Sequence, residues 1–367
     1  MRKDPVTSFP QPGVAPSRRR FLQGLAAGGL IAIAAPVVRA FDSPLTEAAM
    51  LSDRLASSPL LAVARAGSRL IAAGLRGGIV LSEDQGKNWT QAQVPVSVDL
   101  VALSFPTARQ GWAVGHGGVV LHSADGGMTW KKQLDGLEAS RLAIDYYSRN
   151  PEQIAGAEDF LTKERTLVAD QETQPFLSVF FSDELHGHIV GTFNRIFATN
   201  DGGKHWVPQM HLADNPQEWH FYNVSGAPGQ LYITGEQGHV WRHEPQSGRF
   251  VSANTPYNGT LFGVTATDDG QLYAYGMRGS LFRSSNQGQS WERASLPFDS
   301  NLIQLLSLGG NHLLVVGQRG EIARSEDGGQ TFQALRPGNP MPYYGAAVMD
   351  DTHLALAGAL GVRIEAI

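Results

Sequence analysis

The sequence predicts an all-β protein, a seven-bladed β-propeller, from three observations. A glycine that closes an apolar run recurs seven times, and successive copies are 41, 76, 44, 41, 41 and 41 residues apart. In most repeats a Ser-x-Asp-x-Gly-x-x-Trp turn, the Asp box, begins eight residues after this glycine. A period near 41 residues with strand-like content is typical of propellers built from four-stranded blades. The seven glycines are Gly74, Gly115, Gly191, Gly235, Gly276, Gly317 and Gly358.

The fifth repeat shows how one blade is built. Apolar runs at 261–265, 271–276 and 280–284 are separated by turn residues such as Asp269 and Gly270, and the Asp box leads into a fourth strand near Trp291. The turn spacing favours an antiparallel meander. The repeats span 60–92, 99–134, 176–210, 219–252, 260–291, 301–334 and 343–367. The last repeat stops after three strands, so we expect residues 46–55 to supply the fourth and close the ring.

The longest interval between glycines contains an insertion between blades two and three. Residues 135–174 lack the strand pattern, and Ala143 and Tyr147 share one helical face with their neighbours. Pro151 is placed where a second helix would start. We therefore predict a helical hairpin over about 135–174.

Residues 1–40 have the three parts of a twin-arginine signal peptide in order. Arg18, Arg19 and Arg20 precede an uncharged Gly/Ala-rich run at 24–38, and Ala40 ends a small-x-Ala cleavage site. The run is too short and weakly apolar for a stable membrane span. We expect a propeller at 41–367 that begins at Phe41 and acts in the periplasm.

Composition narrows the function classes. The chain has no cysteine, which excludes disulfides and thiol ligands. Residues 1–40 carry six Lys/Arg and one Asp, so the formal net charge of −5 becomes −10 after cleavage. A negative balance argues against nucleic-acid binding. No other run is long enough to cross a bilayer.

The Asp boxes are interpreted as structural staples. The Asp side chain bonds backbone amides across the turn, the glycine permits a positive φ, and the aromatic ring packs under the hairpin. A carbohydrate or metal site is the alternative, but five copies on five blades cannot all be catalytic. The box residues are Asp84, Trp89, Asp125, Trp130, Asp201, Trp206, Asn286, Trp291, Asp327 and Phe332.

The Gly-x-x-Gly turns between the second and third strands carry the candidate partner-binding residues. Because strands alternate in direction, these turns and the helical hairpin share one face, and the Asp boxes lie on the other. Arg76, Arg278 and Arg319 belong to blades one, five and six, and form an arc that suits carboxylates or phosphates. Solvation of tight turns is the other interpretation. The corresponding residues elsewhere are assigned as His116, Asn194 and Glu236, and the aromatic stretch 218–222 is near the same face.

No catalytic, cofactor or metal site is predicted. His186 and His188 have a spacing that suits a metal, but no third ligand is evident. Asp-box propellers include sialidases, which makes a glycosidase the main enzymatic alternative. A glycosidase needs two placed carboxylates, and Glu236 is the only isolated candidate.

The repeats resemble the photosystem II stability/assembly factor family, whose bacterial members are often called BNR or Asp-box repeat proteins. The resemblance covers about 58–367 and is clearest at 70–84 and 276–291. It implies a seven-bladed propeller that is exported and acts as a non-enzymatic chaperone of membrane-complex assembly. It also implies an Arg-rich surface patch, which Arg76, Arg278 and Arg319 match by motif position. The insertion at 135–174 resembles the branch of non-photosynthetic proteobacteria, which is associated with resistance-nodulation-division type transporters.

Three functions follow as hypotheses. The first is a periplasmic scaffold or assembly factor that binds a membrane-protein complex through the Gly-x-x-Gly face. The second is a glycan-binding or glycan-hydrolysing Asp-box protein. The third is a carrier of a lipid or small molecule linked to a transporter.

Overall fold

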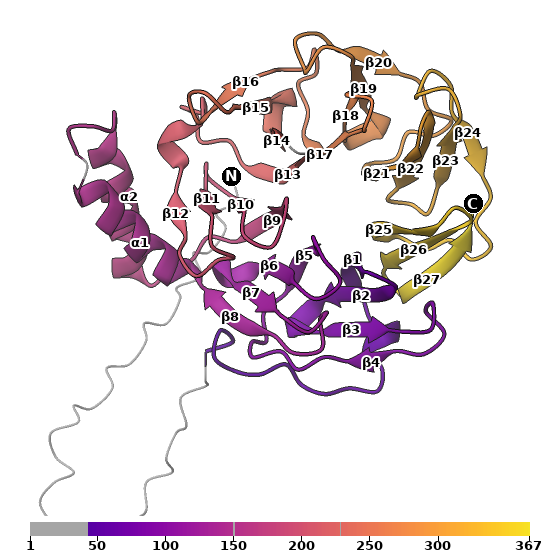
Figure 1. Cartoon of the computed structure of the whole chain (residues 1–367), viewed down its shortest axis with the longest axis horizontal. Helices are drawn as coiled ribbons and strands as arrows, with labels where there is room; N and C mark the ends of the chain where they lie inside the picture. The colour runs from indigo at the N-terminus through magenta and orange to yellow at the C-terminus, as the bar shows by residue number, and fades with distance from the viewer. Residues whose placement is uncertain (1–42, 150, 228) are drawn as a thin grey trace, which may run out of the picture. The chain divides into compact units, whose positions relative to one another are not determined.

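Seven antiparallel sheets form a ring of blades (Figure 1). The computed structural model describes residues 43–149, 151–227 and 229–367. Six of the sheets have four strands in consecutive order, and the seventh has three. The predicted seven-bladed propeller is therefore confirmed. The predicted signal peptide at 1–40 and the start at Phe41 lie outside the described residues.

The strands of each blade follow one another from the centre of the ring outward. Blade one consists of β1 (Leu60–Ala66), β2 (Arg69–Gly74), β3 (Ile79–Ser82) and β4 (Thr90–Gln91). Blade two consists of β5 (Leu100–Ser104), β6 (Gly111–Gly115), β7 (Val120–Ser123) and β8 (Lys131–Leu134). Blade three consists of β9 (Phe176–Phe181), β10 (Gly187–Gly191), β11 (Ile196–Thr199) and β12 (Val207–Pro208). Blade four consists of β13 (Phe221–Ala227), β14 (Gln230–Gly235), β15 (Val240–Glu244) and β16 (Arg249–Ser252).

The remaining three blades complete the ring. Blade five consists of β17 (Leu261–Ala266), β18 (Leu272–Gly276), β19 (Leu281–Ser284) and β20 (Glu292–Ala294). Blade six consists of β21 (Leu302–Gly309), β22 (His312–Gly317), β23 (Ile322–Ser325) and β24 (Gln333–Leu335). Blade seven consists of β25 (Tyr343–Asp350), β26 (His353–Gly358) and β27 (Gly361–Ala366).

The core lies between neighbouring blades. The second strands are buried along nearly their whole length, because both of their faces pack against other blades. Trp112 of blade two stacks on Phe181 of blade three with ring centroids 3.5 Å apart. Tyr275 and Leu281 of blade five pack with Leu302 and Leu313 of blade six in the same way. Apolar residues on both faces of each sheet therefore hold the ring together.

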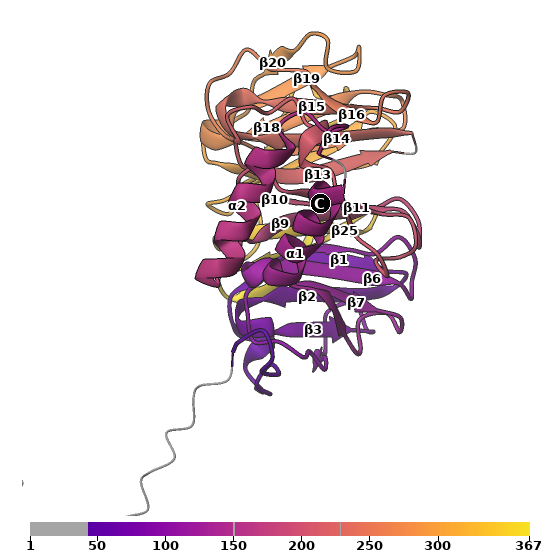
Figure 2. The same ribbon diagram turned by 90° about the vertical axis from the view of Figure 1, so that its left-hand side faces the viewer.

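The insertion between blades two and three is a helical hairpin, as predicted. It consists of α1 (Gly136–Arg149) and α2 (Ala157–Asp170), and it lies at the side of the ring next to blade three (Figures 1 and 2). The second helix begins at Ala157 and not at Pro151, because turns occupy 151–156 and Gly156 has a left-handed φ of 75°. Ala143 and Tyr147 are buried as expected. Neither helix, nor any other in the described residues, is long and apolar enough to cross a membrane.

The predicted role of residues 46–55 in ring closure is wrong. This segment follows the outer edge of blade one, where the Ala49 N–H donates to the Val94 carbonyl (3.0 Å) and Gln91 bonds the backbone of Met50 and Ser52. It covers an edge that β4, only two residues long, leaves largely unpaired. Blade seven has three strands in the described residues, and the ring closes by apolar packing of blade seven on blade one.

Candidate functional site

The Gly-x-x-Gly turns of blades one, two, four and five are short 3-10 turns with one residue at the tip. Arg76 and Arg278 occupy this tip with φ of 53° and 55°, a left-handed conformation that is costly for a residue with a side chain. Glycine follows each of them, and at Gly77 an added Cβ would lie 2.0 Å from the Val96 carbonyl oxygen. Because glycine has no side chain, the segment that leads into the next blade can pack directly against it. The tip residue before the glycine lies on the outer side of the turn.

The next blade holds each tip in place. The backbone N–H of Arg76 donates to Asp99 Oδ1 (2.8 Å), and that of Arg278 donates to Asn301 Oδ1 (3.1 Å). Asp99 and Asn301 each directly precede the first strand of the following blade. The tip backbone is thus anchored through its own amide, and the side chain remains available.

The three arginines of the predicted arc are not equivalent. Within the described part of the chain, the guanidinium groups of Arg76 and Arg278 have no ion pair. Arg319 donates to Asp299 (2.5 Å) and to Glu321 (3.2 Å), and the bond to Asp299 raises the pKa of Arg319 above its ordinary value. Arg319 is therefore already neutralised by its neighbours.

The other assigned turn residues have three different environments. His116 is exposed, with its Nδ1 3.8 Å from Asp99 Oδ2, so the structure brings His116 and Arg76 to one carboxylate. Glu236 accepts the backbone N–H of His220 (3.0 Å). Asn194 is only 3% exposed, so its side chain is not presented to a partner and that assignment is wrong.

The structure aligns the third turn one residue differently from the sequence prediction. Asn194, with a φ of 64°, takes the place of the buried turn glycines, and Phe193, with a φ of 52°, takes the tip. The Phe193 N–H donates to His220 Nδ1 (2.9 Å), and His220 directly precedes β13, which matches the anchoring of Arg76 and Arg278. Sequence reasoning missed Phe193. A polar residue directly before the first strand of the next blade, such as Asp99, Asn301 or His220, accepts the tip N–H and would have indicated which residue is the tip.

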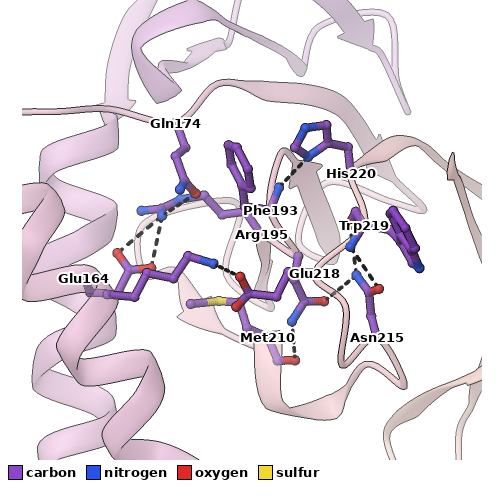
Figure 3. Close-up of polar contacts among 11 residues, drawn as sticks. Glu164, Gln174, Phe193, Arg195, Met210, Asn215, Glu218, Trp219 and His220 are labelled. Atoms are coloured by element: carbon purple, nitrogen blue, oxygen red, sulfur yellow. Dashed lines mark hydrogen bonds and ion pairs between the residues drawn. The ribbon is translucent and has the colours of Figure 1, made fainter.

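An aromatic patch surrounds Phe193 at the junction of blades three and four. Phe193 is 48% exposed and packs edge-on against His220 (Figure 3). The ammonium of Lys163 from α2 lies over the Phe193 ring. Lys163 also pairs with Glu218, and Trp219 stacks on His239. The predicted aromatic contact stretch at 218–222 is half-buried and supports this patch.

A buried arginine next to Phe193 attaches the helical hairpin to blade three. Arg195 is 1% exposed and donates to Glu164 (3.1 and 3.3 Å) and Gln174 (3.1 Å) (Figure 3). It also donates to Ser140 Oγ (2.9 Å). Burial lowers the pKa of Arg195, and the charge of Glu164 opposes that shift. Arg195 Nε has no partner in the described residues. The sequence alone did not indicate this ion pair.

A groove lies beside Arg76 on the same face. Its volume is about 690 Å³, and Met50, Leu55 and Leu75 form an apolar wall next to Arg76. Met50 and Leu75 are 83% and 40% exposed. The groove therefore combines exposed apolar surface with a cation that has no partner.

The central channel has a different character. Its volume is about 440 Å³, and the innermost strands line it with aliphatic, amide and tyrosine side chains such as Asn223, Gln304 and Tyr222. No Asp, Glu, Lys, Arg or His is among these lining residues. The channel offers no acid–base pair.

The Asp-box carboxylates are occupied by their own turns. Asp125 Oδ1 accepts the N–H groups of Met128 and Thr129 (both 3.0 Å), and Trp130 Nε1 donates to the Gly127 carbonyl (3.0 Å). The backbone hydrogen bond of Asn88 lowers the pKa of Asp84 to about 2, and the side-chain bond of Thr331 does the same for Asp327. Asn286 accepts the Ser290 N–H in the same position.

The remaining box residues follow this pattern with small differences. Asp201 accepts the His205 N–H (3.0 Å), and Trp206 is buried. Trp89 donates to the Gly86 carbonyl and Trp291 to the Ala253 carbonyl, and Phe332 packs beside Tyr273 and Leu313.

His186 and His188, whose spacing suits a metal, are in different environments. His186 is exposed and bonded to Asp183, whereas burial lowers the pKa of His188 to about 4. Within residues 43–149, 151–227 and 229–367, no group of three or more His, Asp or Glu side chains has a metal-binding arrangement.

Fold and site together define a seven-bladed Asp-box propeller with unpaired arginines on its Gly-x-x-Gly face. The sequence model described as Photosynthesis system II assembly factor YCF48 matches residues 81–162 and 159–253. The photosystem II assembly protein Ycf48 of Synechococcus sp. (strain JA-2-3B'a(2-13)) is 24% identical over 184 residues, which are 43% of this chain and 53% of that protein. Over these residues the chain is similar to the photosystem II assembly factors, and the predicted family resemblance is confirmed.

Solved structures agree with the fold. Ycf48 bound to a D1 peptide superposes with a TM-score of 0.61 at 18% identity, over 88% of this chain and 96% of that chain. Ycf48 from Cyanidioschyzon merolae gives 0.61 at 15% identity, over 87% and 98%. The WD40 propeller domain of Doa1 gives 0.60 at 10% identity, over 88% and 96%. At these identities the likeness establishes the propeller fold alone.

Proposed function

We propose that this protein is a non-enzymatic assembly or stability factor that holds a polypeptide of a membrane protein complex on its Gly-x-x-Gly face. The observation that carries the proposal is the unpaired Arg76 beside an apolar groove, in a chain related to the Ycf48 assembly factors. This chain covers about half the length of the Synechococcus relative, so the role of that protein is transferred here as a proposal.

The geometry favours a client segment that carries apolar side chains and a carboxylate. Met50, Leu55 and Leu75 offer the apolar wall, and the anchored backbone of Arg76 directs a planar cation to the groove edge. Arginine binds carboxylates through two parallel hydrogen bonds. The solved Ycf48 with a bound D1 peptide supports a peptide ligand in a relative of the same fold.

The site of action belongs to the proposal as well. The twin-arginine motif at Arg18, Arg19 and Arg20 supports export of a folded protein to the periplasm. The insertion at 136–170, which resembles the non-photosynthetic branch, supports a client other than a photosystem. We propose a transporter of the resistance-nodulation-division type as the client complex.

Glycosidase activity has less support. The Asp-box carboxylates are bonded by backbone amides of their own turns, and Glu236 bonds the His220 N–H. A glycosidase needs two carboxyl groups on either side of the scissile bond. The lining of the central channel contains neither Asp nor Glu.

Site-specific photo-crosslinking in cells tests the proposed surface. We expect a photoreactive residue in place of Leu75, in the groove, to trap one subunit of a membrane complex, and Arg76→Glu to abolish the product by repelling the client carboxylate. Met128 is the matched control, because it is 49% exposed and sits on an Asp-box turn of the opposite face. Equal products from both positions, or a Leu75 product that survives Arg76→Glu, would overturn the proposal.

A further inference from the structure

Blade seven exposes the longest outer strand edge of the ring. The outermost strand is β27 with six residues, whereas those of the six complete blades have two to four. Figure 1 shows β27 at the rim, outside β25 and β26. Proteins normally keep such edges short, because unpaired N–H and C=O groups attract another strand. A six-residue edge is therefore a candidate interface.

The hydrogen-bond pattern identifies which groups face outward. The Ile367 N–H donates to the Thr352 carbonyl (2.9 Å), and β27 pairs with β26 in one regular antiparallel register. Backbone groups alternate sides along a strand, so those of Val362, Ile364 and Ala366 point away from β26. Among residues 43–149, 151–227 and 229–367, nothing bonds these outward groups. The free edge thus presents three N–H and three C=O groups.

The edge sequence is complementary to itself in antiparallel orientation. Pairing centred on Ile364 places Ile364 opposite Ile364 of a second copy, and Val362 opposite Ala366. All three outward-facing residues then fall at hydrogen-bonded pairs, as an antiparallel ladder requires. The same register places Arg363 opposite Glu365, so the dimer has two symmetric ion pairs, and each copy supplies the cation of one pair and the anion of the other.

The side chains of the edge agree with this pairing. Arg363 is exposed and has no ion pair with any described residue. Glu365 is 8% exposed, and its carboxylate accepts the N–H groups of Gly338 (2.8 Å) and Asn339 (3.2 Å), which hold it on the face of β27 shared with Arg363. A carboxylate has room for further donors after two hydrogen bonds. It can receive the guanidinium of a neighbouring copy.

We propose that β27 is a dimerisation edge, at which a second copy of this chain pairs antiparallel through a two-fold axis at Ile364. The joined blades then form one continuous six-stranded sheet across the two propellers. This inference does not depend on the proposed client-binding function. The groove beside Arg76 is lined by residues outside β27.

A disulfide test reads the register directly, because the chain has no cysteine of its own. In the proposed dimer the two copies of residue 364 face each other at a Cα separation of about 5.5 Å, which permits a disulfide. The two copies of residue 366 are offset by four residues, roughly 13 Å along the strands. We expect mild oxidation to crosslink Ile364→Cys into a dimer and to leave Ala366→Cys monomeric. Equal crosslinking of both variants, or crosslinking of neither, would overturn the register.

Sedimentation velocity of the purified protein gives a second measurement without cysteines. We expect a concentration-dependent dimer, and Arg363→Glu should weaken it at least about tenfold by placing like charges opposite each other at two symmetric positions. Arg293→Glu is the matched control, an exposed arginine on the outer strand β20 of a complete blade. A wild-type monomer at every concentration, or a dimer insensitive to Arg363→Glu, contradicts the proposal.

Discussion

The turns of blades one and three occupy the same place in the fold and use it differently. In blade one, Gly77 follows the tip residue Arg76 and gives way to the next blade's backbone, and the guanidinium is left without a partner. In blade three, Asn194 stands at the glycine position, and the following residue, Arg195, is buried against the helical hairpin. One turn thus leaves a cation exposed, and next to the other turn a buried cation holds an insertion. The difference shows that a repeat can keep its backbone while the surroundings of its residues change.

The largest expected effect is a difference in the free energy of unfolding between substitutions at Arg195 and at Arg76. Arg195→Ala leaves Glu164 buried without its cation, so we expect a loss of about 3–5 kcal/mol in the free energy of unfolding. Arg76→Ala on the exposed turn should change it by less than about 0.5 kcal/mol. Urea denaturation of both variants checks this. Similar losses for the two substitutions would show that the comparison is mistaken.

The turn glycine of blade one gives the next effect. Gly77→Ala places a Cβ against the Val96 carbonyl oxygen at a φ of 73°, and we expect a loss of about 2–3 kcal/mol. Gly229→Ala is the control, because its φ is also positive, at 78°, but no atom lies within 4 Å of the added Cβ. Thermal melts should show the larger loss for Gly77→Ala. An equal shift in both variants would assign the cost to φ alone.

The reverse substitution in blade three has a smaller effect. Asn194→Gly relieves the left-handed strain but removes the bonds to the Met210 carbonyl and to Asn215, so we expect a net loss of about 1 kcal/mol. Asn194→Ala keeps the strain and loses the same bonds, so its loss should be greater. Chemical denaturation of the pair measures the difference. If the alanine variant is the more stable of the two, the left-handed φ at residue 194 does not strain a residue with a side chain, contrary to the comparison.

The smallest expected effect tests whether blades one and three differ only on the Gly-x-x-Gly face or also at their Asp boxes. The pKa values of Asp84 in blade one and Asp201 in blade three are both lowered to about 2, from an ordinary 3.8. A lowered carboxyl pKa stabilises the folded state above pH 4, and that stability is lost as the pH falls toward 2. Asp84→Asn and Asp201→Asn should therefore flatten the acid unfolding profile to a similar, small extent. A much larger change for one of them would extend the difference between the blades to the Asp-box face.

Sequence reasoning reached the fold because repetition makes the same physical requirement visible many times. Gly74, Gly115 and their counterparts mark where each second strand ends, and the Asp boxes mark the outer hairpins of five blades. It reached the candidate site only in part. Arg76 and Arg278 are exposed as expected, but Arg319 is paired with two carboxylates, which no local pattern indicated. In repeat three, Asn194 replaces the second glycine of the Gly-x-x-Gly turn. Without that glycine the sequence prediction assigned the tip to Asn194, one residue after the actual tip at Phe193.

The sequence by itself determined the number of blades, the turn that ends each second strand and the position of the inserted hairpin, because these depend on short-range patterns of glycine, aspartate and apolar residues. Only the tertiary structure decided which arginines are unpaired, where residues 46–55 run and how blade seven meets blade one. Those outcomes depend on contacts between residues far apart in the chain. Arg195 and Glu164 are 31 residues apart and belong to different elements. Their ion pair exists because packing the hairpin on blade three removes both from water, and a charge buried in that way is stable only beside its partner.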